Sequence, residues 1–398
     1  MTTLKIGIAG AGIGGLALAA GLAQAGHDVT VYDQFDAPRP VGSGLVIQPV
    51  GQAVLARIGA LEMAEAHGAQ VTHMLGHATG KRMPILDVKY GAVSGVARHG
   101  LALHRAALFH AVHHAAIHAG VKLVPSHDAV SVSEGPKRQL RFANGETSAP
   151  FDLVVDASGA GSVLSPLKAR ALPYGAIWGV VDWPKDAPLP AHQLSQHYEA
   201  ARRMVGVLPI GLLPGGTTRK TALFWSLTRD ELSAWHAAPI EDWRAQATAL
   251  WPDAAPYIAG ITQHDQMTPA FYSHGSLRTP VATGLVHIGD AAHRASPQLG
   301  QGANMALLDA WALSQALAGR ADLADALALY HRSRRRHLWV YQWMSAVFTP
   351  LYQSHSRVLP AVRNHLLAPL AQVPPSPYIL SRLVCGDMLA PIRGLDAP

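Results

Sequence analysis

Residues 5–33 read KIGIAGAGIGGLALAAGLAQAGHDVTVYD, and this stretch decides the fold. Residues 5–9 predict a buried strand, residues 16–25 predict an apolar helix, and residues 29–32 predict a second strand. Glycines at the spacing G-x-G-x-x-G separate the first strand from the helix. A strand, a glycine turn, a helix and a strand in this order predict an α/β fold around a parallel sheet.

The glycine turn also predicts a ligand. Gly10 supplies the tight turn, Gly12 lets the backbone approach a pyrophosphate, and Gly15 lets the helix pack closely on the strand. Asp33 ends the second strand, where a carboxylate accepts hydrogen bonds from ribose hydroxyls. A glycine fingerprint alone is a weak signal, but here the strands, the helix and the terminal acid accompany it. The segment therefore predicts a dinucleotide site.

The apolar residues 6–25 behind Lys5 raise the alternatives of a signal peptide or a membrane span. The glycine density and Asp33 argue against both, and no later uncharged apolar run is long enough to cross a bilayer. The single cysteine, Cys385, excludes an internal disulfide and fits a reducing compartment. We therefore expect a cytoplasmic protein without a membrane span.

The composition is that of a large globular protein. The 398 residues suffice for two lobes, and 49% apolar with 15% charged residues exclude a disordered chain. The formal net charge is +6, but the dense basic run, residues 332–336, falls within a helix predicted over residues 321–344. We interpret this run as a solvated helix face and expect no nucleic-acid partner.

A second stretch, Gly289-Asp290-Ala291-Ala292-His293, follows the strand-like run 285–288. It continues through residues 297–304 into a helix predicted over residues 305–317. Asp290 can accept hydrogen bonds from sugar-type hydroxyls, and the first N–H groups of the helix favour negative charge. The stretch therefore predicts contact with a hydroxylated, electron-rich ligand.

Residues 103–119 predict another helix, with Arg105 near its start. An arginine at a helix N-terminus opposes the helix dipole, which favours a ligand role for Arg105. His110, His114 and His118 repeat along this helix at four-residue spacing, but no glutamate or cysteine accompanies them. We interpret them as an exposed face and expect no metal site.

Together these motifs resemble the FAD-dependent single-component (group A) aromatic monooxygenases, the para-hydroxybenzoate hydroxylase-like family. The resemblance spans nearly the whole chain, including the loop from residue 39 to residue 48 and the H-R-x-x-L setting of Arg105, and is most specific at residues 289–304. It implies that Asp33 holds the adenosine ribose and that Asp290 holds the ribityl chain. The residues that it assigns to FAD are Gly10, Gly12, Ile13, Gly14, Gly15, Asp33, Arg39, Gly44, Leu45, Arg105, Asp290, Pro297, Gly300, Gln301, Gly302, Ala303 and Asn304.

One motif departs from the family pattern. Members usually carry an Asp-Gly pair after the middle strand, associated with FAD and NAD(P)H use, and an arginine a few residues later. Here the pair is Ser158-Gly159, and the arginine position is Ser165. The departure affects the expected use of the nicotinamide more than the expected binding of the flavin, since the other flavin motifs are present.

The implied fold is a Rossmann-type FAD-binding domain with an inserted antiparallel-sheet substrate domain and a helical C-terminus. Alternating apolar segments between residues 174 and 272 support the inserted sheet. The expected segments are residues 1–173 for the FAD-binding domain, 174–272 for the substrate domain, 273–330 for the returning part of the FAD-binding domain, and 331–398 for the C-terminal helices.

The resemblance implies hydroxylation of an electron-rich aromatic small molecule, with NADPH or NADH as reductant and a flavin C4a-hydroperoxide, formed with O2, as oxygen donor. Because such a site must exclude water, an apolar pocket is expected. Tyr272, His197 or Tyr198 could ease deprotonation of a phenol, with ordinary packing as the alternative, and no base is assigned. The expected pocket residues are Leu208, Phe224, Trp225, Tyr272, Pro297 and Leu299.

Three other functions stay open at this point. A halogenase shares the fold, but its W-x-W-x-I-P signature is missing at residues 177–184. A reductase or dehydrogenase differs in whether turnover consumes O2. A flavin-binding protein without catalysis, altered at Ser158, would not be reduced by NADPH or NADH. The oligomeric state is open between a monomer and a homodimer.

Overall fold

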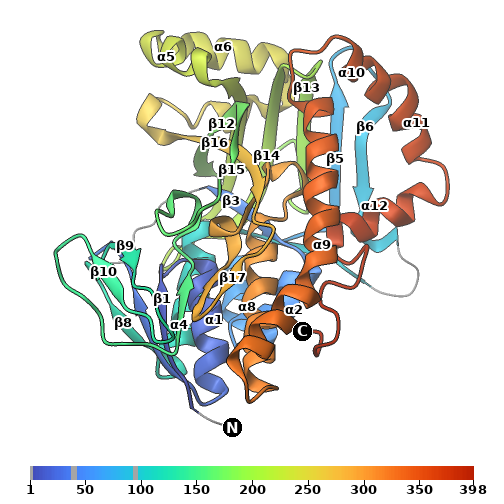
Figure 1. Cartoon of the computed structure of the whole chain (residues 1–398). Coiled ribbons are helices and arrows are strands. Elements are labelled where there is room, and N and C mark those ends of the chain that lie inside the picture. Colours follow the sequence, from blue (N-terminus) through green and yellow to red (C-terminus); the bar gives the residue numbers. More distant parts are fainter. Residues whose placement is uncertain (1–2, 37–42, 93–96) are drawn as a thin grey trace.

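The structure is a computed structural model that describes residues 3–36, 43–92 and 97–398. Two main sheets lie in opposite halves of the molecule, with helices packed around them (Figure 1). The predicted α/β fold, with an inserted antiparallel sheet and a helical C-terminal part, is confirmed. Within the described ranges, no helix has the length and apolar character to cross a bilayer.

The first sheet has six strands in the order β17-β18-β11-β1-β2-β8. All neighbours run parallel except β17, which pairs antiparallel at the edge. Helices α1, α4 and α8 pack on this sheet and share its apolar core. The bounds are β1 Lys5–Ala9, β2 Asp28–Tyr32, β8 Lys122–Val124, β11 Leu153–Asp156, β17 Val281–Ala282, β18 Leu285–His287, α1 Ile13–Gln24, α4 Arg105–His118 and α8 Gly302–Ala318.

The second sheet has eight strands in the order β19-β16-β12-β15-β14-β13-β5-β6. It extends beyond the segment expected from the sequence, because β13 pairs in parallel with β5, which the sequence-based division placed in the first domain. The bounds are β5 His73–Ala78, β6 Pro84–Lys89, β12 Arg170–Asp182, β13 Gln193–Glu199, β14 Arg203–Leu212, β15 Arg219–Thr228, β16 Met267–Ser276 and β19 His293–Arg294.

Different elements cover the two faces of the second sheet. Helices α5 and α6, with α7, cover one face (Figure 1). A three-stranded sheet, in the order β3-β7-β4, packs on the other face. A separate pair, β9 and β10, lies beside the first sheet. The bounds are β3 Gly44–Ile47, β4 Ala69–Val71, β7 Gly100–His104, β9 Ala129–Val132, β10 Leu140–Phe142, α5 Arg229–Ala237, α6 Ile240–Leu250 and α7 Ala255–Ile258.

Two predicted helices have different bounds in the structure. The helix predicted over residues 103–119 begins at Arg105 in the structure, because the residues before it complete β7. The side chain of His104 caps the helix by accepting a hydrogen bond from the N–H of Ala106. The helix predicted over residues 321–344 continues to Tyr352, since buried side chains recur along it to the end. The remaining helices are α2 Pro49–Arg57, α3 Leu61–His67, α9 Leu323–Tyr352, α10 Val358–Val362, α11 Ala368–Ala371 and α12 Ser376–Cys385.

Candidate active site

Two loops far apart in the sequence meet at one edge of the first sheet. Strands β1, β11 and β18 run parallel and in register, so the turns that follow them leave the sheet at the same edge. Gly14, after β1, and Gly289, after β18, both lie against α8. A Cβ atom on either glycine would be 3.2 Å from the Cβ of Ala306. The two predicted halves of the site are therefore next to each other.

The glycine turn after β1 contains two kinds of glycine. Gly10 has a φ of +106°, and a Cβ on Gly15 would lie 2.0 Å from the Gly10 carbonyl oxygen. These two glycines serve the packing of the protein itself. Gly12 has an ordinary φ of −77°, and a Cβ there would meet no atom of the described residues within 4 Å. The space beside Gly12 is therefore open to a ligand group such as a pyrophosphate.

A cavity of about 310 Å³ opens beside this turn. Gly12, Asp33 and Arg105 all line this cavity, so three residues predicted from separate segments are brought together. Phe109 adds an apolar wall of the kind that a purine requires. Asp33 also accepts a hydrogen bond of 2.7 Å from the N–H of Ala11, which holds the acid against the glycine turn.

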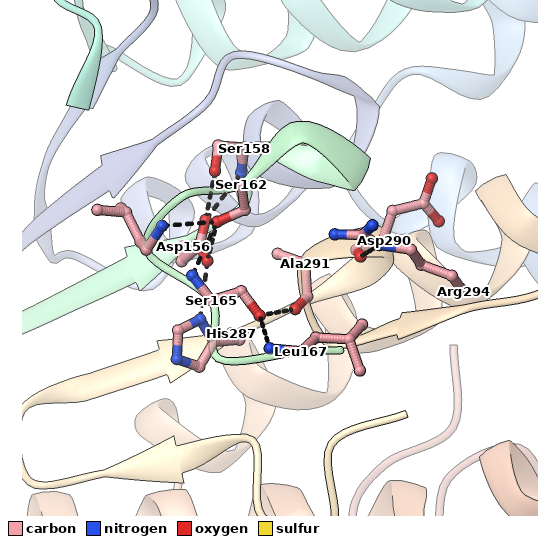
Figure 2. Close-up of polar contacts among 10 residues, drawn as sticks. Asp156, Ser158, Ser162, Ser165, Leu167, His287, Asp290, Ala291 and Arg294 are labelled. Atoms are coloured by element: carbon pink, nitrogen blue, oxygen red, sulfur yellow. Dashed lines mark hydrogen bonds and ion pairs between the residues drawn. The ribbon is translucent and has the colours of Figure 1, made fainter. Parts of the chain in front are cut away.

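Asp290 follows β18 and its side chain is exposed. Its carboxylate accepts no hydrogen bond from any residue in the described ranges, whereas its main-chain oxygen accepts one of 2.9 Å from Nε of Arg294. Figure 2 shows the carboxylate directed away from the side chains around Asp156. The Asp290 carboxylate is thus available to the hydroxyl groups of a ligand.

The loop before α8 presents unused backbone donors. Gly300 has a left-handed φ of +61°, and α8 begins at Gly302 without a side-chain cap. The N–H groups of Gly302 and Ala303 have no partner within the helix, and they carry its partial positive charge. Pro297 precedes them and is exposed. This loop fits the electron-rich edge of a flavin ring.

Two predicted cofactor residues use their side chains to hold this loop in place. Oδ1 of Asn304 accepts from the N–H of Gln48 at 2.8 Å, and its Nδ2 donates to the Val46 carbonyl at 3.2 Å. Nε2 of Gln301 donates to the Val384 carbonyl at 2.8 Å. These side chains fix β3 and α12 against the loop, which is a structural role that the sequence motif did not predict.

Gln48 is a residue of this site that the sequence motifs did not assign to the cofactor. It is fully buried, and its Oε1 accepts a hydrogen bond of 2.7 Å from the hydroxyl of Tyr90. Its Nε2 has no hydrogen-bond partner among the described residues, although it lies 3.4 Å from the position of a Cβ on Gly300. A buried, unpaired amide donor is costly, and a ligand acceptor at this loop would satisfy it.

The structure describes the loop predicted over residues 39–48 only from residue 43. Arg39 lies outside the described residues. Gly44 begins β3, and a Cβ there would be 2.6 Å from the side chain of Ile210, so packing on β14 explains this glycine. Leu45 is half-buried against the core of the first sheet.

A buried ionic network supports the loop after β18. Asp309 of α8 accepts hydrogen bonds from the N–H of Gly289 at 3.0 Å, from Nε2 of His293 at 2.6 Å and from Nε of Arg334 at 2.8 Å. Burial by itself raises the pKa of Asp309, but the charges of His293 and Arg334 outweigh burial and hold it well below its usual range. The interpretation of residues 332–336 as a solvated face is wrong for Arg334, which is 1% exposed.

His337 extends this network and makes stability depend on pH. Its Nε2–H donates to the Gly386 carbonyl at 2.8 Å, and its Nδ1 accepts from Arg334 at 3.3 Å, so the ring is neutral. Burial, followed by the charge of Arg334, lowers the pKa of His337 from 6.5 to about 3. Between pH 6.5 and about pH 3, His337 is protonated in the unfolded chain but neutral in the folded protein. The free energy of unfolding therefore falls as the pH falls, by about 1.4 kcal/mol per pH unit at most.

Thermal unfolding at pH 7 and at pH 5 measures this dependence. We expect acidification to lower the Tm of the wild type more than that of His337→Asn, which lacks the titrating ring. Equal losses in the two proteins would contradict the assignment, whatever the absolute stability of the variant.

A second buried carboxylate organises the turn after β11 (Figure 2). Asp156 is fully buried and accepts hydrogen bonds from Nδ1 of His287 at 2.8 Å, from the Ser158 hydroxyl at 2.6 Å and from the Ser162 hydroxyl at 2.7 Å. Burial raises the pKa of Asp156, but these hydrogen bonds outweigh burial and leave the pKa below its ordinary value. The carboxylate is therefore ionised and used within the turn.

This turn explains how the chain accommodates its departure from the family pattern. Ser158, at the usual aspartate position, donates to Asp156 two residues earlier. Ser165, at the usual arginine position, donates to the Ala291 carbonyl at 2.5 Å and so ties this turn to the loop that carries Asp290 (Figure 2). Neutral hydroxyls thus replace the two charged side chains while the turn stays attached to the site.

The predicted substrate-pocket residues lie on both faces of the second sheet. Leu208 and Phe224 pack on the face toward β3, where the ring of Trp178 is tilted against Phe224 at 4.5 Å between ring centroids. Trp225, the next residue of β15, lies on the opposite face against Trp243 of α6. Since successive side chains of a strand point to opposite faces, Trp225 cannot share a pocket with Phe224.

The other predicted pocket residues also lie in different surroundings. Tyr272 lies beside Trp178, whose Nε1 donates to the Tyr272 hydroxyl at 3.3 Å. Burial raises the pKa of Tyr272 to about 12, although the bond from Trp178 acts in the opposite direction. Leu299 packs into the core of the first sheet, in contrast to the exposed Pro297 two residues earlier.

The two remaining catalytic candidates differ in position. His197 stacks on Trp251 at 6.0 Å between ring centroids, on the face covered by α6, so it lies away from Phe224. Tyr198 is fully buried on the other face, where its hydroxyl donates to Gln196 at 3.0 Å, with Gln298 beside it. Burial raises the pKa of Tyr198 well above its ordinary value, so its phenol stays neutral.

The chain is similar to known flavoproteins over most of its length. A family described as an FAD binding domain matches residues 3–343. The putative 2-heptyl-3-hydroxy-4(1H)-quinolone synthase of Rhodococcus erythropolis is 28% identical over 362 residues, which cover 85% of this chain and 86% of that protein. An FAD-dependent urate hydroxylase of Mycolicibacterium vanbaalenii is 27% identical over 354 residues, which cover 83% and 84%.

A solved structure shows the same fold. The tetrameric form of 2-methyl-3-hydroxypyridine-5-carboxylic acid oxygenase superimposes with a TM-score of 0.79 at 20% identity, covering 96% of this chain and 97% of the other. The fold, the glycine turn with open space at Gly12 and the buried donor of Gln48 all fit an FAD group. With the family match over residues 3–343, the chain belongs to the FAD binding domain family and is an FAD-dependent monooxygenase.

Proposed function

We propose that this protein hydroxylates a flat, electron-rich aromatic ring, using NADPH or NADH as the reductant and O2 as the co-substrate. The observation that carries this proposal is the aromatic cluster of Trp178, Phe224 and Tyr272. Phe224 and Trp178 belong to the face of the second sheet that packs toward β3. Aromatic side chains of this kind bind flat rings and exclude water. The two relatives named above are a quinolone synthase and a urate hydroxylase, whose names refer to heteroaromatic rings.

The proposed roles follow from position. The space at Gly12 and the cavity lined by Asp33 and Arg105 would hold the pyrophosphate and adenosine of FAD. The Asp290 carboxylate would bind the ribityl hydroxyls, and the N–H groups at the start of α8 would face the flavin ring. When bound, FAD supplies electron transfer and oxygen activation. Stabilisation of negative charge at the start of α8 is the electrostatic contribution of the chain to that chemistry.

Tyr272 would act as a hydrogen-bond donor to the substrate. Because its pKa is about 12, the phenol is neutral near pH 7, and its oxygen already accepts the hydrogen of Trp178. Its own O–H therefore remains to orient a polar substituent on the ring. This role suits a substrate that carries its own hydroxyl or carbonyl group.

Removing the hydroxyl with Tyr272→Phe is expected to lower kcat/KM by about tenfold, the effect of one lost hydrogen bond. More NAD(P)H should be oxidised without product, and bound FAD should be unchanged. The assay compares NAD(P)H consumption with hydroxylated product in a screen of aromatic compounds. Trp225→Phe, on the opposite face of the sheet, is the matched control and should behave as wild type. An unchanged Tyr272→Phe, or an equal loss in both variants, would contradict the proposed pocket.

A further inference from the structure

The outward side of α9 is both apolar and basic. Trp339, Trp343 and Val347 are 67%, 54% and 45% exposed and follow one another at four-residue spacing. Exposed arginines continue this row toward the start of the helix. At about 100° per residue, all these side chains fall within roughly one third of the helix circumference. We call the following residues the outer face of α9: Arg332, Arg335, Arg336, Trp339, Trp343 and Val347.

The opposite side of the same helix is fully used within the protein. Arg334 and His337 join the buried network with Asp309, and Ser345 and Thr349 contact Ser296 in the loop before α8. The outer face is therefore not a part of the core that has been left open. It is a second, independent surface of a helix whose inner side is already packed.

From Arg332 to its end, α9 carries charge of one sign. The sequence contains no aspartate or glutamate between Asp325 and Asp387, whereas seven arginines lie between them. Within the described ranges, the ion pairs of α9 are those of Arg334 with Asp309. The guanidinium groups of the outer face therefore have no carboxylate partner on this helix.

Exposed apolar side chains continue after α9. Leu366, Leu370 and Val373 are 54%, 52% and 56% exposed, and they belong to the segment from α10 to α12. Figure 1 shows α10, α11 and α12 at the same side of the molecule as α9. The C-terminal part of the chain thus combines exposed tryptophan, leucine and arginine side chains.

We propose that the outer face of α9 docks on the surface of an anionic phospholipid bilayer. Indole rings favour the boundary between lipid and water, and arginine pairs with lipid phosphates, so this combination is typical of a helix that lies on a membrane. No helix in the described ranges has the properties of a membrane span, so the contact is peripheral. A second copy of the chain is a poorer partner, because packing two outer faces together would bring arginines against a helix that offers no acid after Asp325.

The test is co-sedimentation of the purified, FAD-loaded protein with vesicles. One set contains phosphatidylcholine alone, and the other contains phosphatidylcholine and phosphatidylglycerol in equal parts. We expect binding to the anionic vesicles at low salt, little binding to the neutral ones, and release at high salt. Trp339→Ser with Trp343→Ser should abolish binding, and Arg335→Gln with Arg336→Gln should weaken it by about tenfold or more.

The matched control removes two positive charges from the other half of the molecule. Lys122→Gln with Arg141→Gln, at exposed positions of β8 and β10, should bind as wild type. Equal weakening in this control, or absence of wild-type binding to anionic vesicles, would overturn the proposal. So would a wild type that dimerises in sedimentation equilibrium, ignores vesicles and becomes monomeric in the tryptophan variant. Because the readout is binding, it is separate from the hydroxylation proposed above.

Discussion

Replacing Arg334 by methionine is expected to lower the free energy of unfolding by about 3–5 kcal/mol, the usual cost of leaving a buried charge unpaired. Arg334 is 1% exposed and Asp309 is fully buried, and Nε of Arg334 donates to Asp309 at 2.8 Å. Methionine has a similar length and keeps the apolar contacts, so the loss is mainly electrostatic. Nε2 of His293 would remain hydrogen-bonded to Asp309 at 2.6 Å.

Urea unfolding followed by circular dichroism measures this effect. Arg336→Met is the matched control, because it removes the same group from an exposed position of the same helix, and it should change stability by no more than about 0.5 kcal/mol. Similar values for the two variants would show that the buried network contributes no stability of its own. Since Asp309 also accepts from the N–H of Gly289, the folded fraction of Arg334→Met should bind FAD more weakly.

Replacing Gly12 by valine is expected to weaken FAD binding by about a hundredfold or more while leaving the fold intact. A Cβ there meets no atom within 4 Å in the described ranges, and the φ of −77° suits any residue. The valine would instead occupy the space in which the pyrophosphate is proposed to lie, and a steric overlap of this kind costs on the order of 3 kcal/mol.

Fluorescence titration of the apoprotein with FAD gives the affinity, and thermal unfolding without FAD gives the stability. Gly91→Ala, at an exposed position where a Cβ also meets no described atom within 4 Å, should change neither quantity. Gly15→Ala should differ from Gly12→Val by destabilising the apoprotein as well, because its Cβ would lie 2.0 Å from the Gly10 carbonyl oxygen. Normal FAD affinity in Gly12→Val would place the pyrophosphate elsewhere.

Local signals explain which parts of the fold could be predicted. Within about thirty residues the chain contains the first strand, the glycine turn and the acid at Asp33. The spacing of the apolar residues and the glycines of the turn are therefore enough to predict this part of the fold. The parallel pairing of β13 with β5 joins segments more than a hundred residues apart, and nothing in either strand specifies its neighbour. The eight-stranded sheet was therefore larger than the segment predicted from residues 174–272.

The segments that form the site could be predicted from the sequence, but the positions of several side chains could not. Composition alone does not tell which face of a strand a tryptophan occupies, so Trp225 was grouped with Phe224 although they lie on opposite faces. A run of arginines resembles a solvated face, but residue 334 falls on the buried side of α9, where Asp309 neutralises it. In the helical repeat, residue 334 falls on a different side of the helix from Trp339, which is exposed. This position in the repeat is the signal that separates the buried arginine from the exposed ones.

The most direct test of the account is the amount of FAD that the purified protein holds. After saturation with FAD and removal of the excess, denaturation should release one FAD per chain from the wild type and almost none from Gly12→Val. A folded wild-type protein that stays colourless and retains no added FAD would contradict the central claim that the loops at Gly12 and Asp290 bind one flavin nucleotide between them.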